Sequence, residues 1–379
     1  MSTITRVRVA VLKHHLSTPI YYGEWIMRHR EFVLVRVDTK EGLSGFAYGL
    51  TRDGPISQII GRSIAPAYIG ESIQDPTTIF FKALWTNHAV HASGIGMRAL
   101  SLVDIAVWDA LARSKELSLT RLLGGQPTPL PATAIVGYPP DTPAEEVQEQ
   151  VLILLAKGWC RFKIPISSNL ELSESRLRAV RETAPHAWIG FDINMVLRTA
   201  GDVLAFESKI RDLALGWIED VVPPGDAEMV ADVRRGSVTP VAMGDEQGGS
   251  YHPEALLTAG AVDVLRIDAT TNGGISRMPG ILKQADQAGV VIAPHMFPHV
   301  HSRLMAGLGR VDAPIEWGIP GTGVHPMDDG IEQPIILDGM MLPLADDPGL
   351  GHLVDLSWAQ AQEVSDPDGA LIDIPESAR

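Results

Sequence analysis

The sequence predicts an α/β protein, namely a (β/α)8-type TIM barrel with an N-terminal α+β capping domain that the C-terminal segment completes. Three observations support this prediction. The chain has 379 residues, which is too many for one ordinary compact core. Eight short apolar runs, alternating with amphipathic stretches, recur between residues 132 and 317. Before them the pattern is strands and then helices, and after them the chain is rich in Pro, Gly and Asp.

The capping domain is expected over residues 1–127. Residues 5–12 and 31–37 alternate apolar and polar side chains as strands do, and KEGLSGFAYG looks like a turn and a returning strand. Helical periodicity begins near Ile56 and continues through MRALSLVDIAVWDALARSKEL, and the LLGGQPTPLP that follows suits a domain boundary. The segment TPIYYGEWIMRHR is expected to be a loop between the first two strands.

The barrel is expected over residues 128–320. Thr142 and Glu145 form a capping-box pattern at the start of its first helix. An open doubly wound sheet is the alternative, but VGYPPD after the first run is not the Gly-rich phosphate loop which that fold predicts. The last segment, 321–379, contains strand-like pieces such as PIILDGMMLPL and is expected to pack on the capping domain. The eight predicted strands are residues 132–137, 161–166, 188–194, 216–221, 240–246, 262–268, 290–297 and 314–317.

Composition excludes several classes of function. The formal net charge of −15 argues against nucleic acid and anionic membrane surfaces, which attract clustered Lys and Arg. An anionic small substrate remains possible, because a bound cation and a few lysines can reverse the local field. Cys160 is the single cysteine, so it forms no intrachain disulfide, and we expect it to be a small buried apolar residue. Neither a signal peptide nor a membrane span is evident, and a cytoplasmic protein is expected.

Polar residues stand at the ends of the third to eighth predicted strands, and the second strand carries Lys163. The carboxyl ends of barrel strands converge on one mouth, where sites in this fold lie. A lone carboxylate after a strand is often a helix cap, but acids on three consecutive strands repel one another, and a cation is the simplest remedy. Oxygen ligands without Cys or His favour Mg²⁺ or Mn²⁺ over zinc. In strand order, these residues are Lys163, then Asp192 and Asn194, Glu219 and Asp220, Asp245 and Glu246, Asp268, His295 and Glu316.

Asp268 and His295 form a second constellation on adjacent predicted strands. A carboxylate bonded to one imidazole nitrogen raises the basicity of the other, so His295 is a candidate general base or acid. The alternative is that His295 is a buried histidine with hydrogen-bond partners in the protein. We expect His299 and His301 to be either buried histidines of this kind or surface residues. Lys163 lies inside the apolar strand RFKIPI, where an unpaired ammonium would be costly, so it is a candidate to bind a carboxylate rather than a lysine reaching the surface.

These residues resemble the mandelate racemase/muconate lactonizing enzyme family of the enolase superfamily. The motifs span roughly residues 100–317 and are LVDIAVWDALARSKELSLTRLLGG, GFDIN, WIED, MGDE, LRIDATTNGGISR, APHMF and IEW. The resemblance implies that Asp192, Glu219 and Asp245 bind Mg²⁺, with Glu246 as a neighbour of the site. It also implies abstraction of the proton α to a carboxylate, with the enediolate stabilised on the metal.

The resemblance further implies a mandelate racemase-like His295–Asp268 dyad, a hydrogen bond from Glu316 to the substrate carboxylate, and substrate contact by Asn194. The family often has Lys-x-Lys on the second strand, where this chain has Lys163-Ile164-Pro165. Proline supplies no second base, which disfavours a lysine–histidine racemase. We therefore predict dehydration of an acid sugar to a 2-keto-3-deoxy acid. The alternatives are a racemase or epimerase with another second base, a non-catalytic metal-binding homologue and an unrelated metal-dependent aldolase barrel.

Substrate specificity is expected to come from the capping domain. In its predicted loop, Tyr22 and Trp25 are the predicted substrate contacts, with Tyr21 and Arg28 as further candidates. A loop that only packs on the barrel is equally compatible with these aromatic residues. Met296 and Phe297 are expected to line the pocket beside His295. The predicted partner is a small carboxylate, and a homo-oligomer is expected only as the common state of soluble enzymes.

Overall fold

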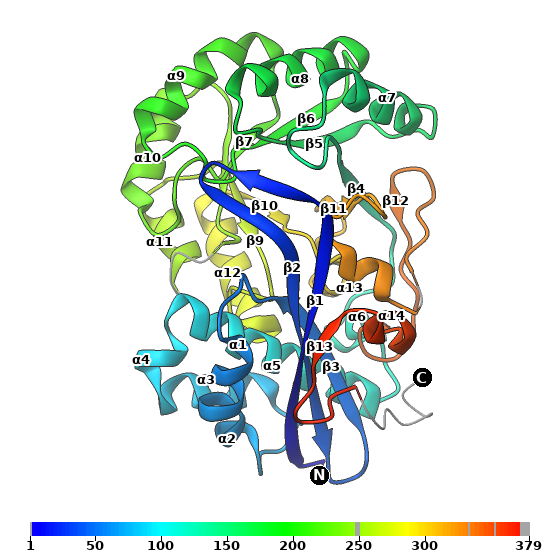
Figure 1. Ribbon diagram of the computed structural model, residues 1–379. Helices are drawn as coiled ribbons and strands as arrows, with labels where there is room; N and C mark the ends of the chain where they lie inside the picture. Colours follow the sequence, from blue (N-terminus) through cyan, green and yellow to red (C-terminus); the bar gives the residue numbers. More distant parts are fainter. Residues whose placement is uncertain (1, 247–250, 333, 352–353, 372–379) are drawn as a thin grey trace.

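The protein, described here by a computed structural model, consists of an antiparallel sheet covered by helices and a parallel barrel that lies against it (Figure 1). The structure describes residues 2–246, 251–332, 334–351 and 354–371. The predicted fold class, a TIM-type barrel with an N-terminal α+β capping domain, is confirmed. The exact boundaries at residues 127 and 320 stay predictions.

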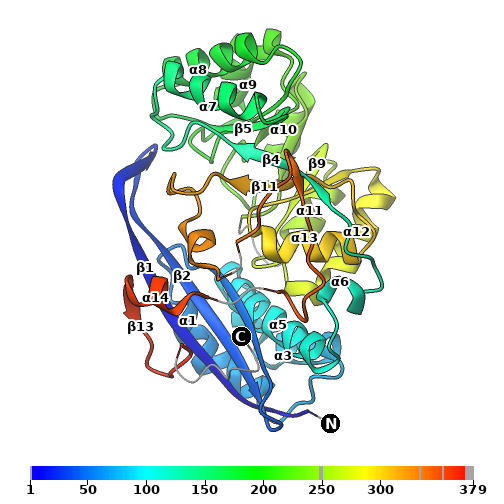
Figure 2. The same cartoon turned by 90° about the vertical axis from the view of Figure 1, so that its right-hand side faces the viewer.

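The sheet of the capping domain has the order β13-β1-β2-β3. Its β1 and β2 form one long antiparallel hairpin, in which Tyr22 pairs with Trp25 and Gly23 turns the chain at φ 60°. The expected loop TPIYYGEWIMRHR is therefore wrong, because strand pairing continues to a two-residue turn. Figure 2 shows the tip of this hairpin reaching the barrel. The strands are β1 (Ile4–Tyr22), β2 (Trp25–Thr39) and β3 (Ser44–Leu50).

Helix α5 (Gly94–Ser114) packs directly on β3, and small residues make this contact possible. A Cβ atom on Gly45 would lie 2.1 Å from the carbonyl oxygen of Ala106, and one on Gly49 would lie 2.8 Å from the side chain of Leu102. The long apolar helix predicted around VDIAVWDA is thus confirmed and buried. The other helices of this domain are α1 (Ile56–Ile59), α2 (Ala65–Tyr68), α3 (Pro76–Thr86), α4 (His88–His91), α6 (Leu119–Leu122) and the π-turn Ile60–Ile64.

Eight parallel strands form the barrel, in the spatial order β10-β9-β8-β7-β6-β5-β4-β11. Strands β10 and β11 lie beside each other and nearly close the ring, without a hydrogen-bonded ladder in the described part of the chain. The register places Pro165 beside Asp192, and Asp192 beside Glu219, at the carboxyl edge. The strands are β4 (Leu130–Ile135), β5 (Arg161–Pro165), β6 (Trp188–Asp192), β7 (Trp217–Glu219), β8 (Val241–Met243), β9 (Val264–Ile267), β10 (Val291–Pro294) and β11 (Ile315–Gly318).

Seven helices connect these strands and cover the outside of the barrel. The predicted capping box is wrong, because Pro143 precedes the first turn of α7 and the Thr142 hydroxyl donates to the carbonyl of Pro139 instead. No helix in the described ranges is long and apolar enough to cross a membrane. The helices are α7 (Ala144–Leu155), α8 (Leu170–Thr183), α9 (Ala200–Ile210), α10 (Ala227–Gly236), α11 (His252–Thr258), α12 (Gly274–Ala288) and α13 (Pro298–Gly307), with a 3₁₀ turn at Arg211–Leu213.

The C-terminal segment contacts both parts of the molecule. Strand β12 (Met341–Leu342) pairs with β4 of the barrel, and β13 (Glu363–Ser365) pairs with β1 of the capping sheet. A 3₁₀ turn at Pro326–Gly330 and helix α14 (Leu356–Gln360) complete it. The expectation of a buried Cys160 is wrong: the residue is exposed just before β5, and its Sγ lies 3.4 Å from the Sδ of Met340.

Candidate active site

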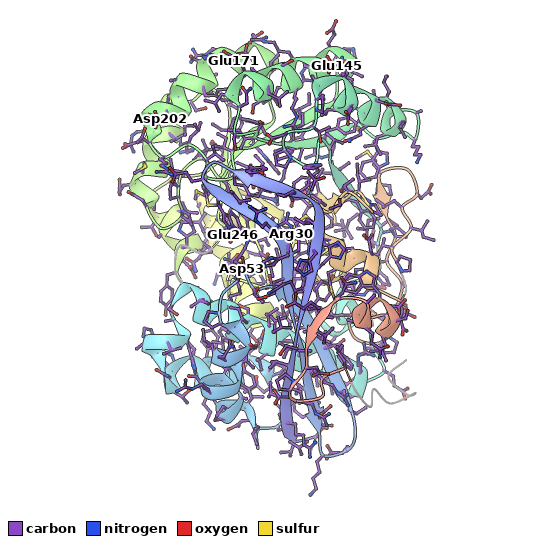
Figure 3. The ribbon with its side chains drawn as sticks, viewed as in Figure 1. Arg30, Asp53, Glu145, Glu171, Asp202 and Glu246 are labelled. Atoms are coloured by element: carbon purple, nitrogen blue, oxygen red, sulfur yellow. The ribbon has the colours of Figure 1, made fainter. Side chains whose placement is uncertain are left out.

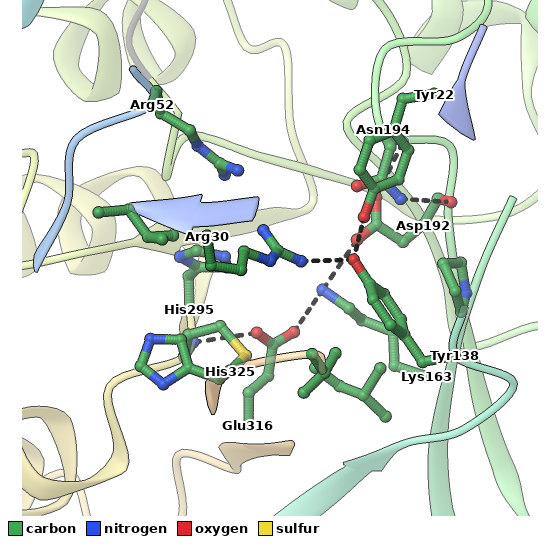
Figure 4. Close-up of a pocket in the computed structure, with 15 residues that line it drawn as sticks. Tyr22, Arg30, Arg52, Tyr138, Lys163, Asp192, Asn194, His295, Glu316 and His325 are labelled. Carbon is green, nitrogen blue, oxygen red and sulfur yellow. Dashed lines mark hydrogen bonds and ion pairs between the residues drawn. The ribbon is translucent and has the colours of Figure 1, made fainter. Parts of the chain in front are cut away.

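A pocket of about 480 Å³, including its opening, lies at the carboxyl end of the barrel strands and beneath the capping hairpin (Figure 4). Barrel residues form its floor, and residues of β1–β3 and the segment after β3 form its roof. Because both parts of the chain contribute, neither alone makes the pocket. The lining residues with polar side chains are Tyr22, Arg30, Arg52, Tyr138, Lys163, Asp192, Asn194, His295, Glu316 and His325.

Lys163 lies at the centre of a buried charge cluster. Its Nζ is 3.0 Å from Asp192 Oδ2, 3.0 Å from Glu219 Oε1 and 2.5 Å from Glu316 Oε1. Burial alone would lower the pKa of Lys163, but the three carboxylates outweigh burial and raise this pKa well above its ordinary value. The lysine is therefore a fixed positive charge in the pocket, as expected from its place inside an apolar strand.

Arg266, which the sequence analysis did not single out, is the second cation of this cluster. It is fully buried on β9, with its Nε 2.8 Å from Glu219 Oε1 and a terminal nitrogen 2.6 Å from Glu316 Oε1. The signal was present in VLRID, an arginine inside an apolar strand, and is the same signal that identified Lys163. The two cations share the same two glutamates and hold them in place.

The three predicted metal ligands belong to one buried group but do not converge on a common point. No choice of one oxygen from each of Asp192, Glu219 and Asp245 brings all three within 4.8 Å of one another. Lys163 lies between Asp192 and Glu219, and Asp245 Oδ2 instead faces His295 Nδ1 at 3.4 Å. The structure therefore brings the acids to one mouth, with a protein cation among them.

The donor set nevertheless fits a divalent cation. Glu219 Oε2 and Asp245 Oδ1 are buried, and neither accepts a hydrogen bond from any described residue. Burial raises the pKa of Glu219 to about 7, although Arg266 and Lys163 oppose this shift. Burial, together with repulsion from Asp245 and Asp192, raises the pKa of Asp220 well above its usual range. Such crowded oxygens with free lone pairs are the ligands that Mg²⁺ prefers.

A second group with metal-like spacing lies on the capping domain, outside the barrel mouth. It consists of His29, Glu31 and Asp53. His29 Nε2 bonds Asp53 Oδ1 at 2.9 Å, and Glu31 accepts a 2.7 Å hydrogen bond from the hydroxyl of Thr51. These side chains already have protein partners, and Asp53 is exposed, so the cluster is explained without a cation.

His295 and Asp268 are paired as expected. His295 Nδ1 lies 3.0 Å from Asp268 Oδ2, which leaves Nε2 of the same ring as the free nitrogen of the pair, and His295 lines the pocket. Burial alone would lower the pKa of His295, but Asp245 and Asp268 outweigh burial and raise it. A paired, partly exposed imidazole at a barrel mouth is suited to proton transfer.

His301 supports this pair from behind and is a satisfied interior histidine. It is fully buried, and its Nε2 accepts a hydrogen bond from the amide of Ala269 at 2.9 Å, so its Nδ1, 2.6 Å from the carbonyl of Met296, is the donor. The same Nε2 lies 3.5 Å from Asp268 Oδ1. The interior interpretation of His301 is confirmed, and His299 is also buried.

Glu316 is held as a carboxylate. Its Oε2 accepts a 3.0 Å hydrogen bond from the amide of Met296, and its Oε1 faces Lys163 and Arg266. Burial alone would raise its pKa, but Arg266 and Lys163 outweigh burial and lower it far below the usual range. Donation from Glu316 to a substrate carboxylate would need a proton that these cations disfavour, so this role stays a prediction.

Strained backbone marks the same edge of the barrel. Five residues other than glycine have positive φ there, namely Asn194 (45°), Met195 (58°), Asp220 (49°), Met296 (41°) and Phe297 (47°). Each such residue costs of the order of 1 kcal/mol, and such strain collects at functional sites. Asn194 lines the pocket, and its backbone N–H donates to Asp192 Oδ1 at 2.9 Å. Met296 also lines it, whereas Phe297 is buried behind it.

The capping domain contributes a group of residues that sequence reasoning mostly missed. Tyr22 hydrogen-bonds Tyr138, and Arg30 donates to the same Tyr138 hydroxyl at 2.5 Å. Of the predicted contacts, Tyr22 lines the pocket, but Trp25 does not: it is 42% exposed and packs against the Tyr22 ring at 5.7 Å. Tyr21 and Arg28 are also exposed. No local pattern distinguishes Arg30 or Tyr138 in sequence, because both acquire their surroundings from distant segments.

Glu246 belongs to the roof rather than to the acidic floor. It is bonded to Arg52, and its Oε2 lies 3.0 Å from a terminal nitrogen of Arg98. Figure 3 shows Glu246 and Arg30 between the two parts of the molecule, whereas Glu145, Glu171 and Asp202 lie on the outer helices of the barrel. Glu246 thus connects the barrel to the capping domain. This position is compatible with the prediction that Asp245, rather than Glu246, is the metal ligand.

The fold is a capped barrel, and acidic residues, a lysine and a histidine meet at the mouth of this barrel. Comparisons with known proteins agree with this class of enzyme fold. Residues 4–124 match the "Mandelate racemase / muconate lactonizing enzyme, N-terminal domain" family, and residues 146–358 match the "Enolase C-terminal domain-like" family. The chain therefore belongs to the mandelate racemase/muconate lactonizing enzyme family of the enolase superfamily.

Individual relatives differ in their reactions. The chain is 29% identical to a D-galactarolactone cycloisomerase of Agrobacterium fabrum, with 78% of each chain covered. It is 28% identical to an L-talarate/galactarate dehydratase of Salmonella typhimurium, with 72% of this chain and 70% of the relative covered. A racemase structure from Streptomyces coelicolor with bound magnesium superposes with a TM-score of 0.85 at 21% identity, covering 94% of this chain and 99% of that one. The relatives support an enzyme with acid-sugar chemistry of the enolase superfamily.

Proposed function

We propose that this protein is a Mg²⁺-dependent hydro-lyase that dehydrates an acid sugar to a 2-keto-3-deoxy acid. The observation that carries the proposal is the His295–Asp268 pair, 3.0 Å apart, in the same pocket as Lys163 and the acidic group. A dehydratase relative and a solved neighbour with bound magnesium support the reaction and the metal. We also propose a cytoplasmic location and a homo-oligomeric state, which are predictions from the sequence.

Asp192, Glu219 and Asp245 would hold the ion, with the free Glu219 Oε2 and Asp245 Oδ1 available to it. Bound Mg²⁺ would polarise the substrate carboxylate and make the proton on the adjacent carbon more acidic. Lys163 would add a second positive charge beside the same carboxylate, because its pKa keeps it protonated. Asn194, on the strained edge beside Asp192, would orient the substrate.

The proton transfer falls to His295. Its neutral imidazole takes the proton from C2, the electron pair forms the C2–C3 double bond, and the C3 hydroxyl leaves. The imidazolium can return its proton to that hydroxyl, so that water departs and the enol then converts to the 2-keto acid. Asp268 acts by fixing the ring and stabilising its positive charge.

Racemisation or epimerisation is the second candidate, since a racemase shares this fold. It needs a base on the opposite face of the substrate. Pro165 lies beside Asp192 and lines the pocket, so the second strand supplies none at that position. This favours elimination, in which one base suffices.

A product assay tests the proposal. Six-carbon aldonic and aldaric acids would be incubated with the protein and Mg²⁺, and 2-keto acid would be detected by reaction with semicarbazide. We expect 2-keto acid from at least one substrate with the wild type and none above background with His295→Asn. Recovery of an epimer without any 2-keto acid would support the second candidate, and no conversion of any substrate would favour a non-catalytic homologue.

A further inference from the structure

One buried cation in the roof of the pocket has no carboxylate partner among the described residues. Arg30, on β2, is 7% exposed and projects from the capping hairpin into the pocket (Figures 3 and 4). Its guanidinium donates to the hydroxyl of Tyr138 at 2.5 Å and also interacts with the hydroxyl of Tyr22, and its Nε has no partner. Among the described residues, no carboxylate lies within ion-pair distance of this guanidinium.

The other cations at the pocket are all neutralised by protein carboxylates. Lys163 and Arg266 share Glu219 and Glu316, and Arg52 is paired with Glu246. A buried guanidinium without an anion is unfavourable, because it loses its water without gaining a counter-charge. Arg30 is therefore the pocket-lining cation that has no carboxylate partner among the described residues, and it comes from the roof rather than from the barrel.

The position of Arg30 indicates what would match it. The proposed reaction places the reacting carboxylate at the barrel floor, beside Lys163 and the acids. Arg30 approaches from the capping strand, and Figure 4 shows its guanidinium next to the Tyr138 hydroxyl. A guanidinium forms two parallel hydrogen bonds with a carboxylate, a geometry that a sugar hydroxyl cannot supply.

We propose that Arg30 binds the second carboxylate of the substrate, so that the substrate class is the aldaric acids, which are dicarboxylic, rather than the aldonic acids. This inference rests on the proposed function for the placement of the reacting carboxylate. Tyr22 and Tyr138, whose hydroxyls meet beside Arg30, lie where they would contact hydroxyl groups of the chain between the two carboxylates.

Binding measurements with matched acids test the inference. Galactarate and glucarate would be compared with galactonate and gluconate by calorimetry in the presence of Mg²⁺, under conditions where turnover is blocked by His295→Asn. Each pair has the same C2–C5 configuration and differs in one terminal carboxylate. We expect the diacid to bind about 10- to 100-fold more tightly, the usual size of a charge-assisted contact. Equal affinity for diacid and monoacid would overturn the inference.

Substitutions then assign the preference to one side chain. Arg30→Met should reduce the preference to within about 3-fold, Arg30→Lys should retain part of it, and the exposed Arg28→Met on the same strand should leave it unchanged. A diacid preference that survives Arg30→Met in a folded protein would refute the role of Arg30. If Arg30→Met does not fold, the loss of bidentate geometry in Arg30→Lys, measured as a smaller preference, decides the matter.

The two proposals fail in different ways. A diacid preference that depends on Arg30, without 2-keto acid formation by the wild type, would support the inference and contradict the dehydratase. Formation of 2-keto acid from monoacids as readily as from diacids would support the dehydratase and contradict the inference. Absence of binding by all four acids would contradict the assignment of Arg30.

Discussion

Arg266 in the barrel and Arg30 in the capping domain are both buried arginines beside the same pocket, and they differ in their partners. Arg266 forms ion pairs with Glu219 and Glu316 and also donates to the carbonyls of Ala293 and Pro294. Among the described side chains, Arg30 has only the phenols of Tyr138 and Tyr22 as its partners. Arg266 is thus neutralised within the barrel floor, whereas Arg30 in the roof keeps a charge that a ligand would neutralise.

We therefore expect the floor to carry out the reaction and the roof to select the substrate. The variant His295→Asn tests this division of roles, and its expected effect is the largest. The variant lacks the imidazole that transfers the proton, so we expect kcat to fall by about 10²–10⁴-fold. Binding of the acid should change little, because the roof is intact. Steady-state kinetics and calorimetry would measure the two effects, with the exposed His186→Asn as the control. A loss of affinity that matches the loss of kcat would contradict the division.

Stability measurements compare the two arginines directly. Arg266→Met leaves two buried glutamates with Lys163 as their remaining cation, and breaking such a buried network costs about 3–5 kcal/mol of unfolding free energy. Arg30→Met removes a buried charge that has no counter-ion, so we expect little loss or a small gain without ligand. Urea unfolding of both variants would show this. Similar losses in the two variants would mean that Arg30 has a structural partner after all.

Metal addition should stabilise the floor and leave the roof unaffected. If Mg²⁺ binds Asp192, Glu219 and Asp245, a concentration of 100 times its Kd adds about 2.7 kcal/mol to the unfolding free energy. We expect Tm to rise with MgCl2 and to fall back with a chelator, and we expect the rise to be lost in Asp245→Asn. NaCl at equal ionic strength is the control for screening. An equal shift with NaCl would argue against a metal at these acids.

Most residues of the pocket floor could be predicted from the sequence, and most residues of the roof could not, because the two sets are brought together by different kinds of contact. Lys163, Asp192, Glu219, Asp268 and His295 each follow or interrupt an apolar strand, and the barrel rule alone brings such residues to one mouth. Arg266 carried the same signal but was not singled out.

The roof depends on contacts between segments that are far apart in sequence. Arg30 meets Tyr138 across 108 residues, and Arg52 meets Glu246 across 194. The hairpin was mistaken for a loop because its pairing partner, not its own composition, makes it a strand. Local periodicity contains no information about such pairings, so neither the unmatched charge nor the position of Trp25 outside the pocket could be predicted.

The smallest expected effect concerns the contact between the two parts. Asp104 on α5 of the capping domain accepts hydrogen bonds from the amide and hydroxyl of Ser276, in the first turn of barrel helix α12, at 3.0 and 2.6 Å. Burial raises the pKa of Asp104 to about 7, although the hydrogen bonds from Ser276 oppose this shift. The folded state therefore binds a proton that the unfolded state has already released above its ordinary pKa of 3.8.

The sign of the pH effect follows from this raised pKa. Stability from protonated Asp104 is fully present below about pH 4 and is lost as the pH rises toward 7, by at most about 1.4 kcal/mol per pH unit. Asp104→Asn cannot ionise, so its stability relative to the wild type should improve between pH 5 and pH 7 and then level off. Urea unfolding at pH 5, 6, 7 and 8 would measure this, with the exposed Asp232→Asn as the control. Parallel pH profiles for Asp104→Asn and the wild type would show that Asp104 is ionised in the folded protein throughout, and that the capping domain binds the barrel through a charged rather than a neutral carboxyl group.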